Sequence, residues 1–181
     1  YSKLLKVIDE SHESVTSNIT TVEMRRDLRL AISEVAEYAI DFGNEFHVQS
    51  MNGFNIRSSA FRVLNINTDV YLYDVPDSTA EKGQVSLFSL NEGSSTPIIQ
   101  RRNIGVIDYK KGRITLDPIN IVSGKTKDNV DILEISATPE SNDIIGLQDL
   151  YLQLDSSFVD MVVDEISSGA DPSGSTYTVT T

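Results

Sequence analysis

Short stretches of alternating apolar and polar residues recur through most of the chain after residue 20. One is Tyr38-Ala39-Ile40-Asp41-Phe42 before Gly43-Asn44, and another runs from Val70 to Val75 before Pro76-Asp77. Period-two alternation that stops at turn residues is typical of β-strands with one buried face. No segment between them has the helical pattern that parallel βαβ units need. The sequence therefore predicts a mainly β (α+β) fold, an N-terminal amphipathic helix followed by antiparallel strands and hairpins.

The clearest local element is a hairpin within Ile104 to Leu116. Its turn is Tyr109-Lys110-Lys111-Gly112, in which Gly112 can adopt a positive φ and form a glycine bulge. Asp108 can cap this turn through its side chain. We therefore expect Gly112→Val to disrupt the hairpin.

The remaining strand predictions follow the same logic. Pro118 is expected to separate the hairpin from the next strand, because proline cannot donate a ladder hydrogen bond. A turn is expected at Ser123-Gly124. Further strands are predicted at Val85 to Ser89, Ile119 to Val122, Val130 to Ala137 and Thr176 to Thr180. The patterns of Leu147 to Leu154 and Asp160 to Ile166 fit either a strand or a helix, and a strand is preferred for both.

Only the first segment, Tyr1 to about Ser17, has a convincing helical pattern. Its apolar stripe follows the spacing of a short coiled coil and comprises Tyr1, Leu5, Ile8, His12, Val15 and Ile19. About two heptads are too short to be a stable helix alone. Leu5, Ile8, His12 and Val15 are therefore the candidate interface with a partner helix. The same stripe would serve equally well for packing on the chain's own β domain.

These patterns divide the chain into three parts. Residues 1–19 form a helical segment for a bundle or for docking, and residues 20–166 form an antiparallel β-rich domain. Residues 167–181 form a Ser/Thr/Gly-rich C-terminal tail that could add a strand to a sheet edge. Because the sequence opens at Tyr1 and not at Met, we expect it to be a piece of a longer protein.

Composition excludes several classes of function. The formal net charge of -12 disfavours nucleic acids and anionic lipid as partners, and no apolar run is long enough to span a bilayer. The absence of cysteine excludes thiolate catalysis and sulfur-ligated metals. Neither His12 nor His47 has a nucleophile motif around it, and Asp128-Asn129-Asp131 lacks most features of a calcium loop. No catalytic residue, cofactor site or metal site is therefore predicted.

Charge is distributed unevenly along the chain. Between Arg101 and Lys127 there are seven basic and two acidic residues, whereas residues 128–181 contain eleven acidic and no basic ones. Such blocks usually mark solvated surface. The alternative is a pair of complementary patches that steer one copy of the chain, or a partner, onto another.

Three stretches, taken in order, resemble a known family. They are Leu4-Leu5 to Ile8-Asp9 leading into Ser17 to Val22, then Asn103 to Ile114, and then Thr138 to Ile144. Together they resemble the C-terminal part of the baseplate wedge proteins of T-even-like contractile-tailed bacteriophages, the gene product six family. The resemblance covers most of the chain.

The resemblance implies a structural role. In that family two copies of the subunit join a different wedge protein through a helical bundle, and contacts between copies close a ring around the baseplate hub. It implies a non-enzymatic viral assembly protein of the virion tail, present in host cytoplasm during assembly, whose partners are copies of itself and other wedge proteins. The alternative is a carbohydrate-binding or carbohydrate-cleaving β module of a tail or receptor-binding protein. That function would need exposed aromatic rings or two facing carboxylates.

Overall fold

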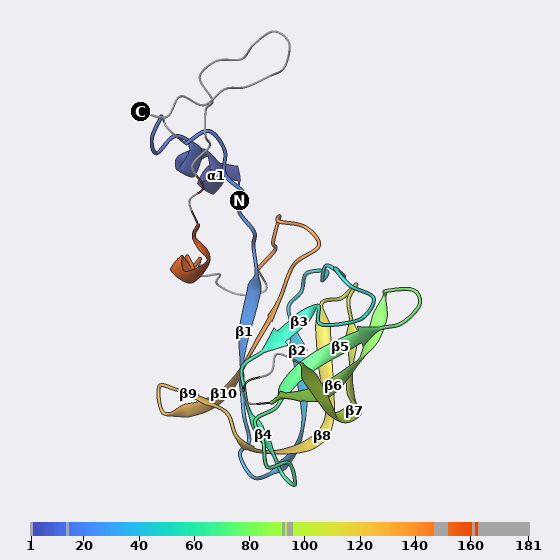
Figure 1. Ribbon diagram of the computed structural model, residues 1–181. Helices are drawn as coiled ribbons and strands as arrows, with labels where there is room; N and C mark the ends of the chain where they lie inside the picture. The colour runs from blue at the N-terminus through green and yellow to red at the C-terminus, as the bar shows by residue number, and fades with distance from the viewer. Residues whose placement is uncertain are drawn as a thin grey trace. The chain divides into compact units, whose positions relative to one another are not determined.

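The computed structural model describes residues 2–13, 15–91, 93, 96–146, 152–160 and 162. The chain divides into two compact units, Tyr1–Gln148 and Asp149–Thr181. The first unit contains the helix α1 (Ser2–Asp9) and all the strands (Figure 1). In the second, the described residues form one short 3-10 turn, η1 (Ser156–Phe158).

The strands form two antiparallel sheets. The first has the order β1-β10-β3, with β9 also pairing with β10, and its strands are β1 (Met24–Arg29), β3 (Ile56–Ser58), β9 (Lys125–Lys127) and β10 (Val130–Ala137). The second has the order β2-β8-β7-β6-β5, with β4 also pairing with β8. Its strands are β2 (Val35–Asp41), β4 (Arg62–Val63), β5 (Tyr71–Pro76), β6 (Lys82–Leu90), β7 (Pro97–Asp108) and β8 (Arg113–Ser123).

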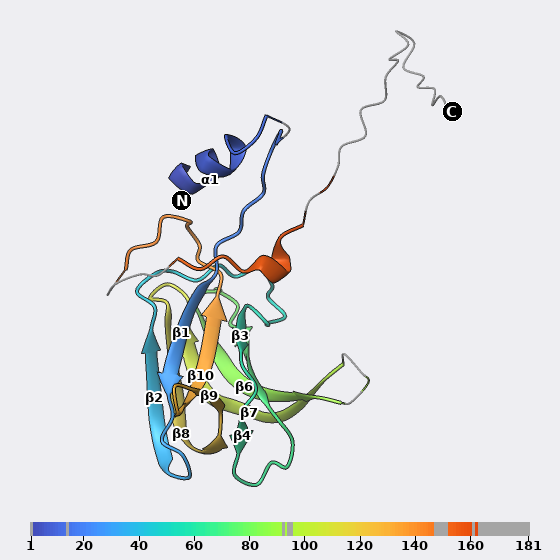
Figure 2. The same ribbon diagram turned by 90° about the vertical axis from the view of Figure 1, so that its left-hand side faces the viewer.

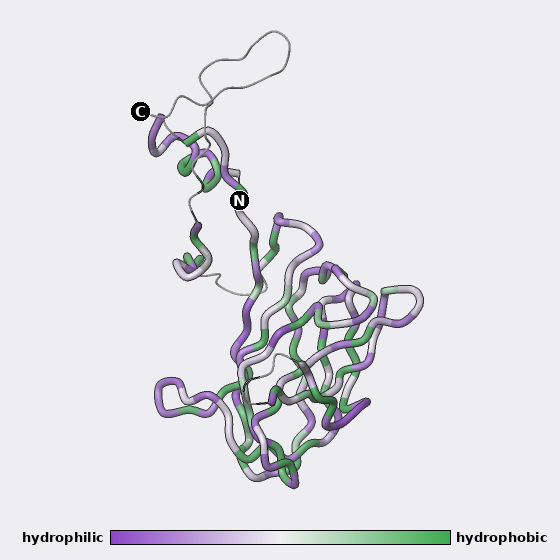
Figure 3. The backbone as a smooth tube through the Cα atoms, in the orientation of Figure 1, coloured by the Kyte–Doolittle hydropathy of each residue, from purple (hydrophilic) through white to green (hydrophobic). Residues whose placement is uncertain are grey.

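The two sheets share one hydrophobic core. In the second view β1 and β10 lie in front of β7 and β8 (Figure 2). Leu133 and Ile135 of β10 and Ile114 and Leu116 of β8 have no exposed surface and belong to the same cluster. In β2 and β8 buried residues alternate with more exposed ones. Hydrophilic residues concentrate at turns such as the one between β9 and β10 (Figure 3). The antiparallel, mainly β fold predicted from the alternation is confirmed.

The predicted hairpin is confirmed as the β7–β8 turn. Gly112 has φ 62°, and the backbone N–H of Lys111 donates to the Asp108 carboxylate at 3.0 Å. A Cβ atom at Gly112 would lie 1.9 Å from the carbonyl oxygen of Asn44. Both the positive φ and the close backbone approach therefore require glycine at this position.

Two strand predictions need correction. Pro118 does not separate two strands, because β8 continues through it. The strand tolerates proline because Asp117 and Pro118 together oppose Glu37 of β2, which forms a bulge. Of the strand predicted over Leu147 to Leu154, the described residues 152–154 have no regular structure. Most of the strand at Asp160 to Ile166, and all of that at Thr176 to Thr180, lies outside the described residues.

The predicted helix is too long. The α1 helix ends at Asp9, well before Ser17. Just after it, the Ser11 side chain donates to the Ile8 carbonyl at 2.7 Å, and the Asn18 amide donates to the Asp9 carboxylate at 2.5 Å. Side chains of this type compete with the helical ladder for backbone groups and so favour a helix end.

Candidate interaction surfaces

The four predicted interface residues do not share one helix. Leu5 and Ile8 lie on α1 and are half-buried, whereas His12 and Val15 follow its end. The backbone N–H of Val15 donates to the carbonyl of His12 at 3.0 Å, which closes a separate turn. The continuous apolar face expected over these four residues is therefore limited to Leu5 and Ile8. Their contact with a partner helix stays a prediction.

Apolar residues of the N-terminal segment, residues 2–23, are more exposed than those of the β-sheets. Val7 is 65% exposed and Ile19 is 97% exposed. The buried core residues of the described chain all fall between Met24 and Ala137. The apolar side of α1 is consequently not part of that core. No helix among the described residues has the length and apolar character needed to cross a membrane.

A cluster of aromatic rings lies at the outer side of β5 and β6. Tyr71 and Tyr73 come from β5, Phe88 from β6 and Phe54 from the loop before β3. The ring of Phe54 is stacked on Tyr73 with centroids 5.0 Å apart and contacts Phe88 edge-on at 5.4 Å. Phe54 is 46% exposed and has φ 65°, an unfavourable conformation for an aromatic residue.

A buried carboxylate holds the loop that carries Phe54. Asp74 on β5 is fully buried and accepts hydrogen bonds from the backbone N–H groups of Asn55 and Ile56 at 2.8 and 2.9 Å. It also accepts from the Asn55 amide at 2.7 Å and the Tyr109 hydroxyl at 2.6 Å. Four donors satisfy a buried charge well, so Asp74 is a structural anchor in this arrangement. Burial, together with the neighbouring Asp74 carboxylate, raises the pKa of Tyr109 well above its usual range.

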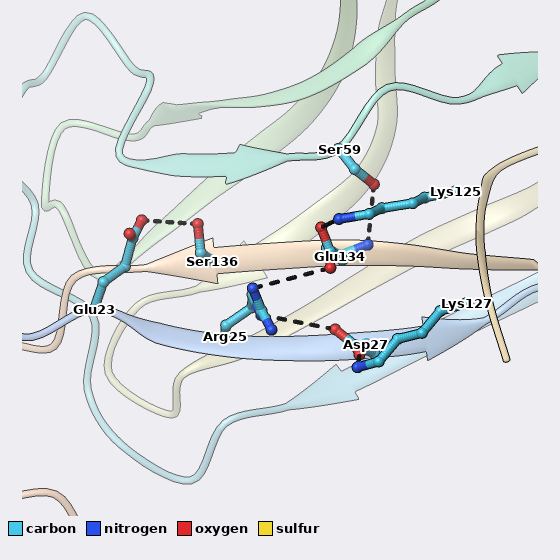
Figure 4. A network of polar contacts seen from close by, with 8 residues as sticks. All are labelled: Glu23, Arg25, Asp27, Ser59, Lys125, Lys127, Glu134 and Ser136. Carbon is cyan, nitrogen blue, oxygen red and sulfur yellow. Dashed lines mark hydrogen bonds and ion pairs between the residues drawn. The ribbon is translucent and has the colours of Figure 1, made fainter. Parts of the chain in front are cut away.

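The outer face of the first sheet carries a polar network (Figure 4). Lys127 contacts Asp27 at 2.5 Å and Lys125 contacts Glu134 at 2.7 Å, while Arg25 lies 3.9 Å from both carboxylates. The hydrogen bond to Asp27 raises the pKa of Lys127. At one end of the network the Ser136 hydroxyl donates to Glu23 at 2.7 Å. Part of the basic 101–127 block is thus neutralised within the chain, on a solvated face.

His47 contacts a carboxylate at the surface. The Nδ1 atom of His47 lies 2.7 Å from a carboxylate oxygen of Glu140, and both side chains are about half exposed. His12 is exposed and lies in the N-terminal segment. Within the described part of the chain, no three His, Asp or Glu side chains gather as they would around a metal ion. The arrangement of His47 and Glu140 ties two loops together at the surface, since the backbone N–H of His47 also donates to the Thr138 carbonyl at 2.9 Å.

Sequence reasoning missed the aromatic cluster. The alternation from Val70 to Val75 does predict that Tyr71 and Tyr73 lie on the face opposite Leu72 and Asp74, but not that the two rings join a cluster. Nothing in the sequence indicated that Phe54, a loop residue, would pack onto them.

Comparison with known proteins identified no relative. No protein-family model matches the chain, and no curated protein or solved structure is significantly similar to it.

Proposed function

We propose that this chain is a non-enzymatic structural subunit of a contractile phage tail baseplate, acting in the wedge or inner ring of the virion. The observation that carries the assembly role is the N-terminal segment, whose apolar residues lie outside the core of the chain. Exposed side chains such as Val7 and Ile19 gain free energy only when another surface covers them. A helix of eight residues also needs external packing to be stable.

The polar groups of the β-sheets support a non-enzymatic role. Asp74 is buried and saturated with donors, and Glu134 and Asp27 are neutralised by lysines. Catalytic groups are instead held near a substrate with unsatisfied bonding capacity. The polar interactions of this chain hold loops and strands together.

The assignment to a baseplate rests on the resemblance of the three sequence stretches to the wedge family. It names copies of this chain and other wedge proteins as partners, and neither nucleic acid nor membrane. The host cytoplasm is the place of assembly. Leu5 and Ile8 are the contact residues on α1, and His12 and Val15 extend the contact beyond the helix end.

Self-association of the purified chain tests this proposal. Sedimentation equilibrium over a range of concentrations should show a dimer or a larger species. The variant Leu5→Gln with Ile8→Gln should shift the chain toward monomer, because it removes apolar contact area but keeps good helix formers. Lys3→Gln with Lys6→Gln is the matched control on the exposed side of α1 and should associate as the wild type does.

Two results would count against the proposal. One is a wild-type chain that stays monomeric over the whole range. The other is a Leu5/Ile8 variant whose β-sheets unfold, as seen in its circular dichroism spectrum, because α1 would then belong to the chain's own core.

A second candidate function, carbohydrate binding, is favoured by the aromatic cluster. Sugars stack on free ring faces, and Phe54 is the most exposed ring of the four. However, Phe54 and Tyr73 already stack on each other, and Tyr73 is almost fully buried. Binding to a glycan array that is lost in Phe54→Ala would favour this function over assembly.

A further inference from the structure

Strand β7 has different neighbours along its two halves. Its pairing with β6 extends from Lys82 opposite Asp108 to Leu90 opposite Pro97. Pairing with β8, on the other edge, covers only residues 105–108. Among the described residues, no strand pairs with that edge of residues 97–104. Its backbone N–H and C=O groups are therefore available to an added strand.

Irregularities in both strands explain why β7 and β8 separate. In β8 the bulge falls at Asp117 and Pro118, and Pro118 has no N–H to donate. In β7 the register with β6 shifts near Asn103, which has φ 55° and donates its backbone N–H to the Ser86 hydroxyl at 3.2 Å. The outer half of β7 is thus directed away from β8. The arms of the β6–β7 hairpin extend past the other strands (Figure 2).

A small hollow of about 150 Å³ lies where the two strands part. Its lining comes from both strands and consists of Arg101, Asn103, Ile104, Asp117, Pro118 and Ile119. Ile104 and Ile119 are buried, whereas Arg101 is exposed. The open edge therefore combines free backbone groups with an apolar floor and a net positive charge, because Arg101 and the adjacent Arg102 outnumber the Asp117 carboxylate.

The charge of this edge selects an acidic occupant. Of the seven basic residues between Arg101 and Lys127, five form ion pairs, namely Lys110, Lys111, Arg113, Lys125 and Lys127. Within the described chain, Arg101 and Arg102 have no carboxylate within ion-pair distance. Pairing two β7 edges with each other would bring like charges together, which is unfavourable. A segment with carboxylates and no basic residue fits better.

Residues 152–160 have the acidic charge and the exposed apolar side chains that the open edge of β7 requires of an added strand. Leu152 and Leu154 are 83% and 77% exposed and alternate with polar residues, as in a strand with one apolar face. The backbone is extended at Asp155, with φ -89° and ψ 96°, and again at Val159. The segment contains Asp155 and Asp160 and no lysine or arginine.

We propose that residues 152–160 of one molecule add as a strand to the open edge of β7, residues 97–104, in a second molecule. The main chain supplies hydrogen bonds, the leucines cover apolar surface, and the aspartates approach Arg101 and Arg102. The short turn η1 becomes extended in the complex. The Asp155 carboxylate then exchanges the hydrogen bonds that it accepts from the Ser157 backbone N–H and hydroxyl for contact with arginine. This contact is separate from α1 and goes beyond the proposed function.

A charge-swap experiment tests the contact between molecules. It is made in the Leu5→Gln, Ile8→Gln background, so that association through α1 does not contribute. One chain carries Arg101→Glu with Arg102→Glu, and the other carries Asp155→Lys with Asp160→Lys. Each alone should associate at least about tenfold more weakly than the parent in sedimentation, since like charges then meet. An equimolar mixture should regain association, because each edge then meets a segment of opposite charge.

A matched control changes the same charge elsewhere. Arg29→Glu with Arg57→Glu alters two exposed arginines of the first sheet and should leave association unchanged. The proposal is overturned if the parent chain does not associate, if the edge variant and the control behave alike, or if the mixture remains as weak as its components. Failure here leaves the α1 result untouched, so the two proposals are judged separately.

Discussion

The β-sheets and the N-terminal segment use the same apolar residue types in opposite ways. In the sheets Ile135 and Leu133 have no exposed surface, whereas Val7 and Ile19 in the N-terminal segment are mostly exposed. The sheets are completed by contacts between strands far apart in sequence, such as β1 with β10. The difference teaches that burial, rather than composition, separates the part that stabilises itself from the part for which we propose a partner. Four predictions test this comparison.

The largest effect is expected for Gly112→Val in the β7–β8 turn. Valine at φ 62° is strained, and its Cβ would lie 1.9 Å from the Asn44 carbonyl oxygen. The free energy of unfolding should fall by more than about 4 kcal/mol in urea denaturation. Gly93→Val is the control, because Gly93 has φ 77° but no atom within 4 Å of a built Cβ. A loss as large in the control would show that strain alone, without the clash, decides the effect.

The next prediction compares isoleucine in the two regions directly. Ile135→Ala should lower the free energy of unfolding by about 3 kcal/mol, since it removes fully buried methyl groups and leaves a cavity. Ile8→Ala, in α1, should lower it by less than about 0.5 kcal/mol, because Ile8 is only half-buried and lies outside the β core. Urea denaturation of both variants measures the difference. Equal losses would place Ile8 in the same core and abolish the distinction between the regions.

Sequence reasoning worked where one local cause determines the structure. The strand Val130 to Ala137 was predicted with the bounds that β10 has, because aliphatic residues on both faces indicate a buried strand. Gly112 identified its turn for a similar reason, since a positive φ after Asp108 favours glycine. Local patterns of this kind need no knowledge of distant residues.

Other features depend on contacts that a local pattern cannot show. The end of α1 depends on Asn18, which reaches back nine residues to Asp9. The sequence predicts a break at Pro118, but the bulge opposite Glu37 keeps this residue within β8. The open edge of β7 exists only because β8 leaves it. For the candidate interface, the sequence located Leu5 and Ile8 on a helix but extended that helix too far.

A moderate effect is expected for Tyr109→Phe, which removes one of the four donors to Asp74. The loss should be about 1–3 kcal/mol near neutral pH, because a buried charged group loses a partner. The folded state keeps Tyr109 protonated because its pKa is raised, whereas the unfolded chain ionises near pH 10.0. Wild-type stability should therefore fall above about pH 10, by about 1.4 kcal/mol per pH unit from this group.

The Tyr109→Phe variant should lack the part of the fall in stability above about pH 10 that comes from ionisation of Tyr109. Urea denaturation at pH 8, 10 and 11 compares the slopes, and Tyr71→Phe in the aromatic cluster is the matched control. Identical slopes for wild type and Tyr109→Phe would contradict the role assigned to the Asp74 anchor.

The smallest effect is expected at the surface, where ion pairs of the two regions can be compared. The Arg113 guanidinium donates two hydrogen bonds to Asp41 and joins β2 to β8, and it lowers the pKa of Asp41. A lowered carboxyl pKa stabilises the fold above pH 3.8, and this contribution disappears as pH falls through the folded value. Asp41→Asn should therefore cost about 0.5 kcal/mol at pH 7 and nothing near pH 2. Lys6→Gln breaks the exposed ion pair between Lys6 of α1 and Glu10, which directly follows the helix. It should leave the unfolding of the β-sheets unchanged at either pH, and a comparable cost there would mean that α1 unfolds together with the sheets.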